Sequence, residues 1–218
     1  MTDMAALLER VDRLESLEQI RQLPAKYALC VDMRDFDAMA NLFTSDVKVS
    51  KSRSGRQEMK QWYDTTMRHR VIGSAHGIHG HVIDFETTEL ATGLVYSRND
   101  LETEDTWMME FMAYLDRYER QDGVWYFQRR TPLYWYQCDH ANPPVGGGEN
   151  KIRWSGQEWM AGGFHAAFPS WTDFWNEVDK GGTAPVKPPA PLYRFLETFR
   201  RGEDAPRVLI QTNSETKG

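Results

Sequence analysis

The feature that most constrains the fold is a change in hydrophobic pattern near residue 74. Before this point, apolar residues recur at three- and four-residue steps, the period of a helix, most clearly from about residue 4 to 33. After it come runs rich in β-branched and aromatic residues, near 75–85, 91–103, 106–119 and 124–136. Helices followed by a meander of strands predict an α+β fold, with the helices packed on one curved antiparallel sheet.

Local signals refine these elements. Pro24 interrupts the first helical pattern, which predicts either a kink or two abutting helices. Asp35 is a suitable N-cap for a short second helix, and Ser54 with Gln57 has the spacing of a capping box before a third. The pair Asp122-Gly123 separates the last two runs and predicts a tight hairpin.

From about residue 141 the chain loses any period. The segments "NPPVGGGEN" and "DKGGTAPVKPPAP" are rich in residues that break helices and strands. We therefore expect one domain over residues 1–140 and an irregular extension over 141–218 that lies on the domain or on a neighbouring subunit. Its aromatic side chains are candidates for closing the mouth of a site: Phe164, Phe168, Trp171, Phe174 and Trp175.

Composition excludes several classes of function. The net charge is −6 and the basic residues are scattered, whereas a nucleic-acid surface needs a basic stripe, so we expect no nucleic-acid partner. No apolar run is long enough for a signal peptide or a membrane span, which predicts a soluble cytoplasmic protein without a membrane partner. Two cysteines are too few for a disulfide framework. Aromatic residues make up 12% of the chain, and so many rings suit a pocket for a ring-bearing ligand.

Three of the six histidines, His76, His79 and His81, lie within six positions at the start of the first strand run. Strand alternation places His76 on one face, with His79 and His81 on the other, unless a bulge at the flanking glycines changes the count. We therefore interpret His79 and His81 as sheet-face residues. The nearby acids Asp84, Glu86 and Glu89 look like solvated charges at a strand end.

A metal site is the alternative interpretation of this stretch. Gly73, His79, His81, Glu86 and Gly93 fit the first cupin motif, and two imidazoles with a carboxylate would suit Fe(II), Mn or Ni. A cupin also needs a second motif with a third histidine, which the chain lacks, and it would not begin with some thirty residues of helix. We expect no metal and no other cofactor.

Three motifs together resemble the SnoaL-like group of the nuclear-transport-factor-2-like superfamily over about residues 5 to 140. They are "YALCVDMRDFDAMANLFTSDV", "SAHGIHGHVIDF" and "DGVWYFQRR". The matching residues are Tyr27, Ala28, Asp32, Asp35, Asp37, Leu42, Phe43, Asp46, His76, Asp84, Phe85, Trp125 and Arg130. The resemblance implies a cone-like α+β barrel, assembled as a homodimer or homotrimer, with a pocket between helices and sheet.

Within this superfamily the chain is most similar to scytalone dehydratase and hexachlorocyclohexane dehydrochlorinase. These enzymes use an Asp–His pair, without a cofactor, to remove a proton and expel a leaving group. The resemblance assigns these roles to Asp32 and His76, and adds Tyr27 and Arg130 as catalytic candidates. The group often has Asn four residues after the histidine, where this chain has Gly80, so any leaving-group contact must come from elsewhere.

The residues themselves fit this chemistry. Imidazole is the side chain best suited to act as a base near neutral pH, and a carboxylate on its other nitrogen fixes the tautomer. Asp32 follows apolar neighbours, so it is partly buried and needs a partner. Alternatively, Asp32 caps the following turn and His76 is only a wall residue. Arg130 could bind an anionic or phenolate oxygen, or pair with Asp32 or Glu110.

These observations predict a cofactor-independent lyase acting on a hydrophobic, hydroxylated, aromatic small molecule. Dehydration is the plainest reaction, and the lignin diarylpropane γ-formaldehyde lyases, which release formaldehyde, resemble the same group. The alternative is a non-catalytic binding or assembly module of the same fold. The predicted substrate-binding residues are Trp62, Trp107, Tyr126, Tyr134 and His79, with Tyr63 and Trp135 as further candidates for pocket walls.

Overall fold

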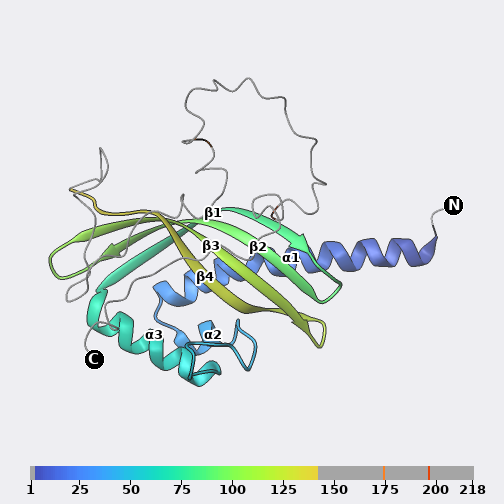
Figure 1. Ribbon diagram of the computed structural model, residues 1–218, viewed down its shortest axis with the longest axis horizontal. Coiled ribbons are helices and arrows are strands. Elements are labelled where there is room, and N and C mark those ends of the chain that lie inside the picture. The colour runs from blue at the N-terminus through green and yellow to red at the C-terminus, as the bar shows by residue number, and fades with distance from the viewer. Residues whose placement is uncertain (1–2, 142–173, 175–195, 197–218) are drawn as a thin grey trace.

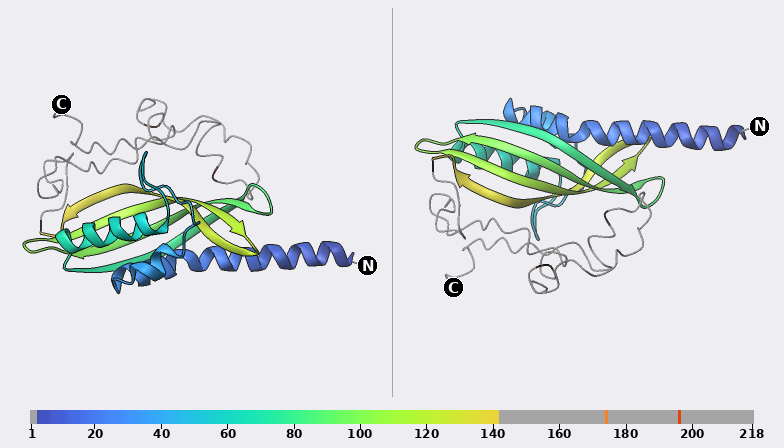
Figure 2. Two further views of the ribbon diagram at one scale, coloured as in Figure 1. Left: turned by 90° about the horizontal axis from the view of Figure 1, so that it is seen from below. Right: turned by 90° about the horizontal axis from the view of Figure 1, so that it is seen from above.

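The computed structural model describes residues 3–141 together with Phe174 and Leu196, and it confirms the α+β prediction (Figure 1). Four antiparallel strands form one curved sheet in the order β1-β2-β3-β4, and the helices all cover the same face of it (Figure 2). The helices are α1 (Met4–Asp32), α2 (Phe36–Ala40) and α3 (Arg56–Arg70); the strands are β1 (Gly73–Phe85), β2 (Leu90–Glu102), β3 (Trp107–Gln121) and β4 (Val124–Asp139). No helix in this described part is both long enough and apolar enough to span a membrane.

The hairpin predicted between the last two strands is present. Asp122 and Gly123 both have positive φ angles, 51° and 80°, as the two central residues of a type I′ turn require. Such a turn matches the twist of the flanking strands, so β3 and β4 pair along their whole length, from Gln121↔Val124 to Met108↔Asp139.

Bulges decide which side chains face the helices. The pairing passes from Ile78↔Ser97 to Gly80↔Tyr96, so His79 is an extra residue in β1. Beyond it the alternation is shifted by one position. His81, Ile83 and Phe85 consequently point to the same inner face as His76, and the unbroken alternation expected from the sequence is wrong. Similar shifts leave Gln128 and Trp135 as extra residues in β4.

Helix α1 carries two apolar stripes rather than one. In its second half Ile20, Leu23 and Val31 are buried against the sheet, whereas in its first half Leu7 and Leu14 are 43% and 64% exposed. At 100° per residue these two sets lie on opposite sides of the helix. The helix also runs without interruption through Pro24, so the chain does not form two abutting helices. Its first half projects beyond the sheet (Figure 1).

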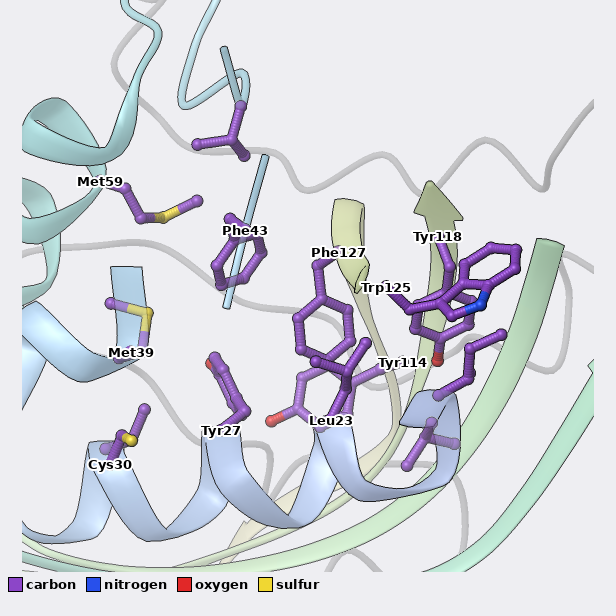
Figure 3. Close-up of a cluster of buried hydrophobic side chains, with 14 of the residues drawn as sticks. Leu23, Tyr27, Cys30, Met39, Phe43, Met59, Tyr114, Tyr118, Trp125 and Phe127 are labelled. Carbon is purple, nitrogen blue, oxygen red and sulfur yellow. The ribbon is translucent and has the colours of Figure 1, made fainter. Parts of the chain in front are cut away.

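The core lies between the sheet and α1, with the segment that follows α2 closing one side of it (Figure 3). Phe43 forms a parallel bridge with Phe127, and the amide of Thr44 donates to the Phe127 carbonyl at 3.0 Å. This segment therefore extends the sheet beyond β4. The largest buried rings come from it and from the last two strands: Phe43, Tyr118, Trp125 and Phe127.

Two local predictions are wrong. The N-cap of helix α3 is Gly55, which has a φ of 100° and no side chain to cap the helix. Ser54 forms a β-bridge with Lys48 and does not form the predicted capping box with Gln57. Asp84 is not a solvated charge, because it is only 4% exposed and accepts a 2.6 Å hydrogen bond from the backbone amide of Leu196. Leu196 packs on the outer face of the sheet, against a cluster that includes Leu94 and Leu133.

We predict that a chain ending at residue 140 keeps its barrel, because all the described residues of the main inner-face core come before that point. It should nevertheless unfold at lower denaturant than the full chain, since Leu196 no longer covers the outer face. The full-length Leu196→Ala variant isolates this contribution and should lose about 2–3 kcal/mol of unfolding free energy. Urea unfolding followed by circular dichroism measures the stability of the truncated chain and of the Leu196→Ala variant. A truncated chain without a cooperative transition would place the extension within the core.

Candidate functional site

The site begins where α1 ends. Arg34 adopts a left-handed conformation, with φ of 62°, and closes the helix as a Schellman motif. Its amide donates to the carbonyl of Val31 at 3.1 Å, and the amide of Asp35 donates to the carbonyl of Cys30 at 2.9 Å. The Arg34 guanidinium also donates to Ser74 Oγ in β1 at 2.7 Å. These bonds hold the last helical residue, Asp32, directly against the first strand.

Asp32 binds β1 through three hydrogen bonds. The backbone amide of His76 donates to Oδ2 at 2.8 Å, Ser74 Oγ donates to Oδ1 at 2.8 Å, and His76 Nδ1 lies 2.7 Å from Oδ1. Partial burial acts to raise the pKa of Asp32, but the hydrogen bonds from His76 and Ser74 outweigh it and lower that pKa. Asp32 is therefore a carboxylate that can accept the Nδ1 proton of His76, and in the neutral imidazole this tautomer leaves Nε2 without a proton.

Tyr27 and Tyr63 lie beside this pair. Their hydroxyl groups are 2.6 Å apart, and the Tyr27 ring stands edge-on to the imidazole of His76, with 6.3 Å between ring centroids. Burial raises the pKa of both phenols, so both stay protonated near neutral pH. The structure thus brings Tyr27, as predicted, next to Asp32 and His76, together with a second hydroxyl from α3.

Arg130 lies in a cage of aromatic rings and pairs with an acid that the sequence did not suggest. Its guanidinium carbon is 4.4 Å from the centroid of Tyr27 and 4.0 Å from that of Tyr114. It donates twice to Asp116, at 2.9 Å each, and neither Asp32 nor Glu110 is its partner. Its Nη1 atom is buried without a hydrogen-bond partner. Val47 and Met59 line a hollow of about 610 Å³ beside Arg130.

His81 belongs to the same interior. Tyr118 donates its hydroxyl proton to Asp116 at 2.9 Å and lies 3.0 Å from His81 Nε2, so Nε2 carries the histidine proton. Burial, helped by the charge of Arg130, lowers the pKa of His81 to about 4. His81 is therefore a neutral donor at physiological pH and not a second acid–base group.

A row of polar side chains crosses the inner face of the sheet from His76. In the strand register His76 is opposite Asn99, Asn99 is opposite Glu110, and Glu110 is opposite Gln137. Glu110 accepts from Gln137 at 2.6 Å and from Asn99 at 3.4 Å. Sequence reasoning missed Asn99 and Gln137, because only the register of the strands shows that they neighbour His76 and Glu110.

The other predicted substrate-binding residues are scattered. Tyr134 packs against the inner-face core, and Trp62 reaches it through an edge contact with Tyr63, although Trp62 is 45% exposed. Trp107 is 54% exposed at the start of β3, and Tyr126 contacts Arg56. His79 lines a hollow on the outer face of about 430 Å³, where Trp135 stacks on Tyr96. Of the predicted lid aromatics only Phe174 lies within the described residues.

The cupin-like motif does not assemble. His79 points outward while His81 points inward, and Glu86 pairs with Arg117 at the strand end. Within residues 3–141, Phe174 and Leu196, no three His, Cys, Asp or Glu side chains are grouped so that they could hold a metal ion. The bulge at His79 is the physical reason, because it sends the two imidazoles to opposite faces.

Comparison with known proteins places the chain in a family. The model of the SnoaL-like domain matches residues 12–131, which is more than half of the chain. The chain belongs to the SnoaL-like domain family. No curated protein sequence matches this SnoaL-like chain.

Solved structures share the SnoaL-like fold. A hexachlorocyclohexane dehydrochlorinase (LinA) of type 2 has a TM-score of 0.56 and 19% identity, and the match covers 63% of this chain and 99% of that one. A protein provisionally named scytalone dehydratase, from Novosphingobium aromaticivorans, has a TM-score of 0.54 and 22% identity, covering 66% of this chain and 97% of that one. At these identities the likeness establishes the cone-like α+β architecture.

We predict that Arg130→Met lowers the unfolding free energy by about 3–5 kcal/mol, since it leaves the fully buried Asp116 without its counter-charge. The double variant Arg130→Met, Asp116→Asn removes both charges and keeps an acceptor for Tyr118, so it should recover most of that loss. Urea unfolding measures all three proteins. A double variant no more stable than Arg130→Met would contradict the pairing as the source of the effect.

We also predict a pH effect from His81. Its pKa is about 4 in the folded protein and about 6.5 unfolded, so both states are neutral above pH 6.5. Between pH 6.5 and 4 only the unfolded chain takes up the proton, and this histidine then lowers the unfolding free energy by up to about 3 kcal/mol. Between pH 7 and pH 4.5, the unfolding free energy of His81→Gln should fall by less than that of the wild type. His79→Gln, in the same strand but exposed, is the control and should match wild type.

Proposed function

We propose that this SnoaL-like protein is a cofactor-independent lyase in which His76 is the base and Asp32 its partner. The observation that carries the proposal is the 2.7 Å contact between His76 Nδ1 and the Asp32 carboxylate, on an imidazole whose side chain is 6% exposed. A carboxylate at this nitrogen stabilises the imidazolium that forms when Nε2 takes a proton. The negative end of the α1 helix dipole, next to Asp32, favours the same positive charge.

The interior favours a hydrophobic, hydroxylated, aromatic substrate. Tyr27, Tyr63, Tyr114 and Tyr134 supply ring faces and edges around the pair, and their hydroxyl groups can bind substrate oxygens. Arg130 Nη1 is a further buried donor that still lacks an acceptor, and a phenolic oxygen would satisfy it. Two structural neighbours are named as a dehydratase and a dehydrochlorinase, and both names denote eliminations.

The reaction is an elimination. In its plain form, His76 removes a proton from carbon, the electron pair of that C–H bond forms a C=C bond, and hydroxide leaves from the adjacent carbon with a proton as water. For a 1,2-diarylpropane-1,3-diol the proton comes instead from the terminal hydroxyl. The C–C bond to that carbon then breaks, and the products are a stilbene, formaldehyde and water. In both forms one base and one proton donor are sufficient.

The test uses purified full-length protein with 1,2-bis(4-hydroxyphenyl)propane-1,3-diol and with a β-hydroxyketone, 3-hydroxy-1,3-bis(4-hydroxyphenyl)propan-1-one. We expect the protein to convert at least one of the two compounds, and the absorbance of the conjugated product measures the reaction. His76→Ala and Asp32→Asn should each reduce kcat by about 10²-fold or more, equivalent to about 2.7 kcal/mol of barrier. The double variant should be little worse than the worse single variant, because the two residues act as one unit.

The matched control is His79→Ala, which removes an exposed imidazole three positions from His76 on the outer face. It should keep wild-type activity and stability. If neither compound were turned over but both bound, the non-catalytic binding module would be the better description. Activity retained by His76→Ala would instead contradict His76 as the base. The homodimer or homotrimer expected from the resemblance stays a prediction for light scattering.

A further inference from the structure

Four polar side chains that face the same interior lie in one line across the sheet. Neighbouring strands are about 4.8 Å apart, so the backbone of Glu110 lies roughly 10 Å from that of His76, with Asn99 between them. Gln137 continues the line on β4. The residues Asn99, Glu110 and Gln137 are 1%, 5% and 2% exposed. Polar groups are costly to bury in this way unless they are hydrogen-bonded.

Not every polar atom in this line has a hydrogen-bond partner. Asn99 divides its amide hydrogens among Glu110, Tyr114 and Met112, and Gln137 donates to Glu110 at 2.6 Å. The Gln137 Oε1 atom, however, is buried without a partner. An orphaned buried acceptor beside a carboxyl group is a place where a hydroxyl group would be bound.

The proposed elimination still needs an acid, since hydroxide is a poor leaving group and must depart as water. Burial raises the pKa of the Tyr27 and Tyr63 phenols, which makes them weaker acids. Burial also raises the pKa of Glu110, although Asn99 and Gln137 oppose the shift, so the acid form of this carboxyl group is favoured more than that of an exposed glutamate. The titratable groups that face it are His76 on β1, Tyr114 on β3 and Tyr134 on β4.

We propose that Glu110 is the acid that protonates the departing hydroxyl group, held in place by Asn99 and Gln137. This inference rests on the proposed lyase function. A substrate lying across the line presents its acidic hydrogen to His76 and its hydroxyl group to Glu110. As His76 Nε2 takes the proton, the C=C bond forms, the C–O bond breaks, and the Glu110 proton joins the leaving oxygen to give water. Imidazolium and carboxylate remain, and a proton returned through water resets both.

The first experiment needs no substrate. Infrared spectroscopy of the full-length protein at neutral pH should show the C=O band of a protonated carboxylic acid, shifted in D₂O and missing in Glu110→Gln. Gln keeps the size of the side chain, and rotation of the Gln137 amide supplies an acceptor for its new N–H group. A wild-type protein without this band, or a Glu110→Gln variant that keeps it, would overturn the proposal.

The second experiment separates this role from that of His76. It compares the 1,2-diarylpropane-1,3-diol used above with its benzylic acetate, whose leaving group departs without a proton. Glu110→Gln should lose at least about 10²-fold in kcat on the diol and less than about fivefold on the acetate, whereas His76→Ala should lose heavily on both. If Glu110→Gln lost the same factor in kcat on both compounds, the role of Glu110 would be structural and the inference would be overturned. Retained activity of His76→Ala would instead overturn the lyase proposal itself.

Discussion

The attachment of Asp32 to β1 is the interaction on which the arrangement of this protein depends. It joins the end of α1 to the edge strand of the sheet through three hydrogen bonds, so the helix cannot shift without releasing them. A carboxylate at the negative end of a helix is unfavourable by itself. Here the donors of Ser74 and His76 offset that repulsion, and the same bonds orient the imidazole. The contact that positions the helix thus also orients the imidazole that we propose as the base.

Charges in the remaining interior are stabilised by partners rather than by water. Arg130 and Asp116 neutralise each other inside a cage of rings, where an unpaired charge would be strongly destabilising. Tyr118 adds a third bond to Asp116 and connects the pair to His81. Among the described residues, the buried polar atoms without a hydrogen-bond partner include Arg130 Nη1 and Gln137 Oε1 on the inner face. One is a donor and the other an acceptor, which matches a ligand that carries more than one oxygen group.

The sequence was sufficient for the fold, because the elements depend on local patterns, whereas the pairing of Asp32 with His76 was expected only from the family resemblance. Helical period, strand composition and the Asp122-Gly123 turn specify the elements, and the motifs around Asp32 and His76 identify the family. What it could not supply is register. The bulge at His79 reverses the facing of His81 and Phe85, and the pairing of strands alone brings Glu110 beside Asn99 and Gln137. Asp84 and Asp116 bind partners far from them in the sequence, the Leu196 amide and Arg130 respectively, so their neighbours in the sequence did not indicate their burial.

The environments of His76 and His81 explain why two inward-facing imidazoles in one strand are not equivalent. His76 contacts the Asp32 carboxylate and lies near the negative end of a helix, and both features attract positive charge. His81 contacts a neutral phenol and lies close enough to Arg130 for that charge to oppose its protonation. Of these two imidazoles, His76 is therefore the one whose surroundings suit the base that we propose. The extra residue between them, His79, allows both rings to face inward while each receives a different electrostatic surrounding.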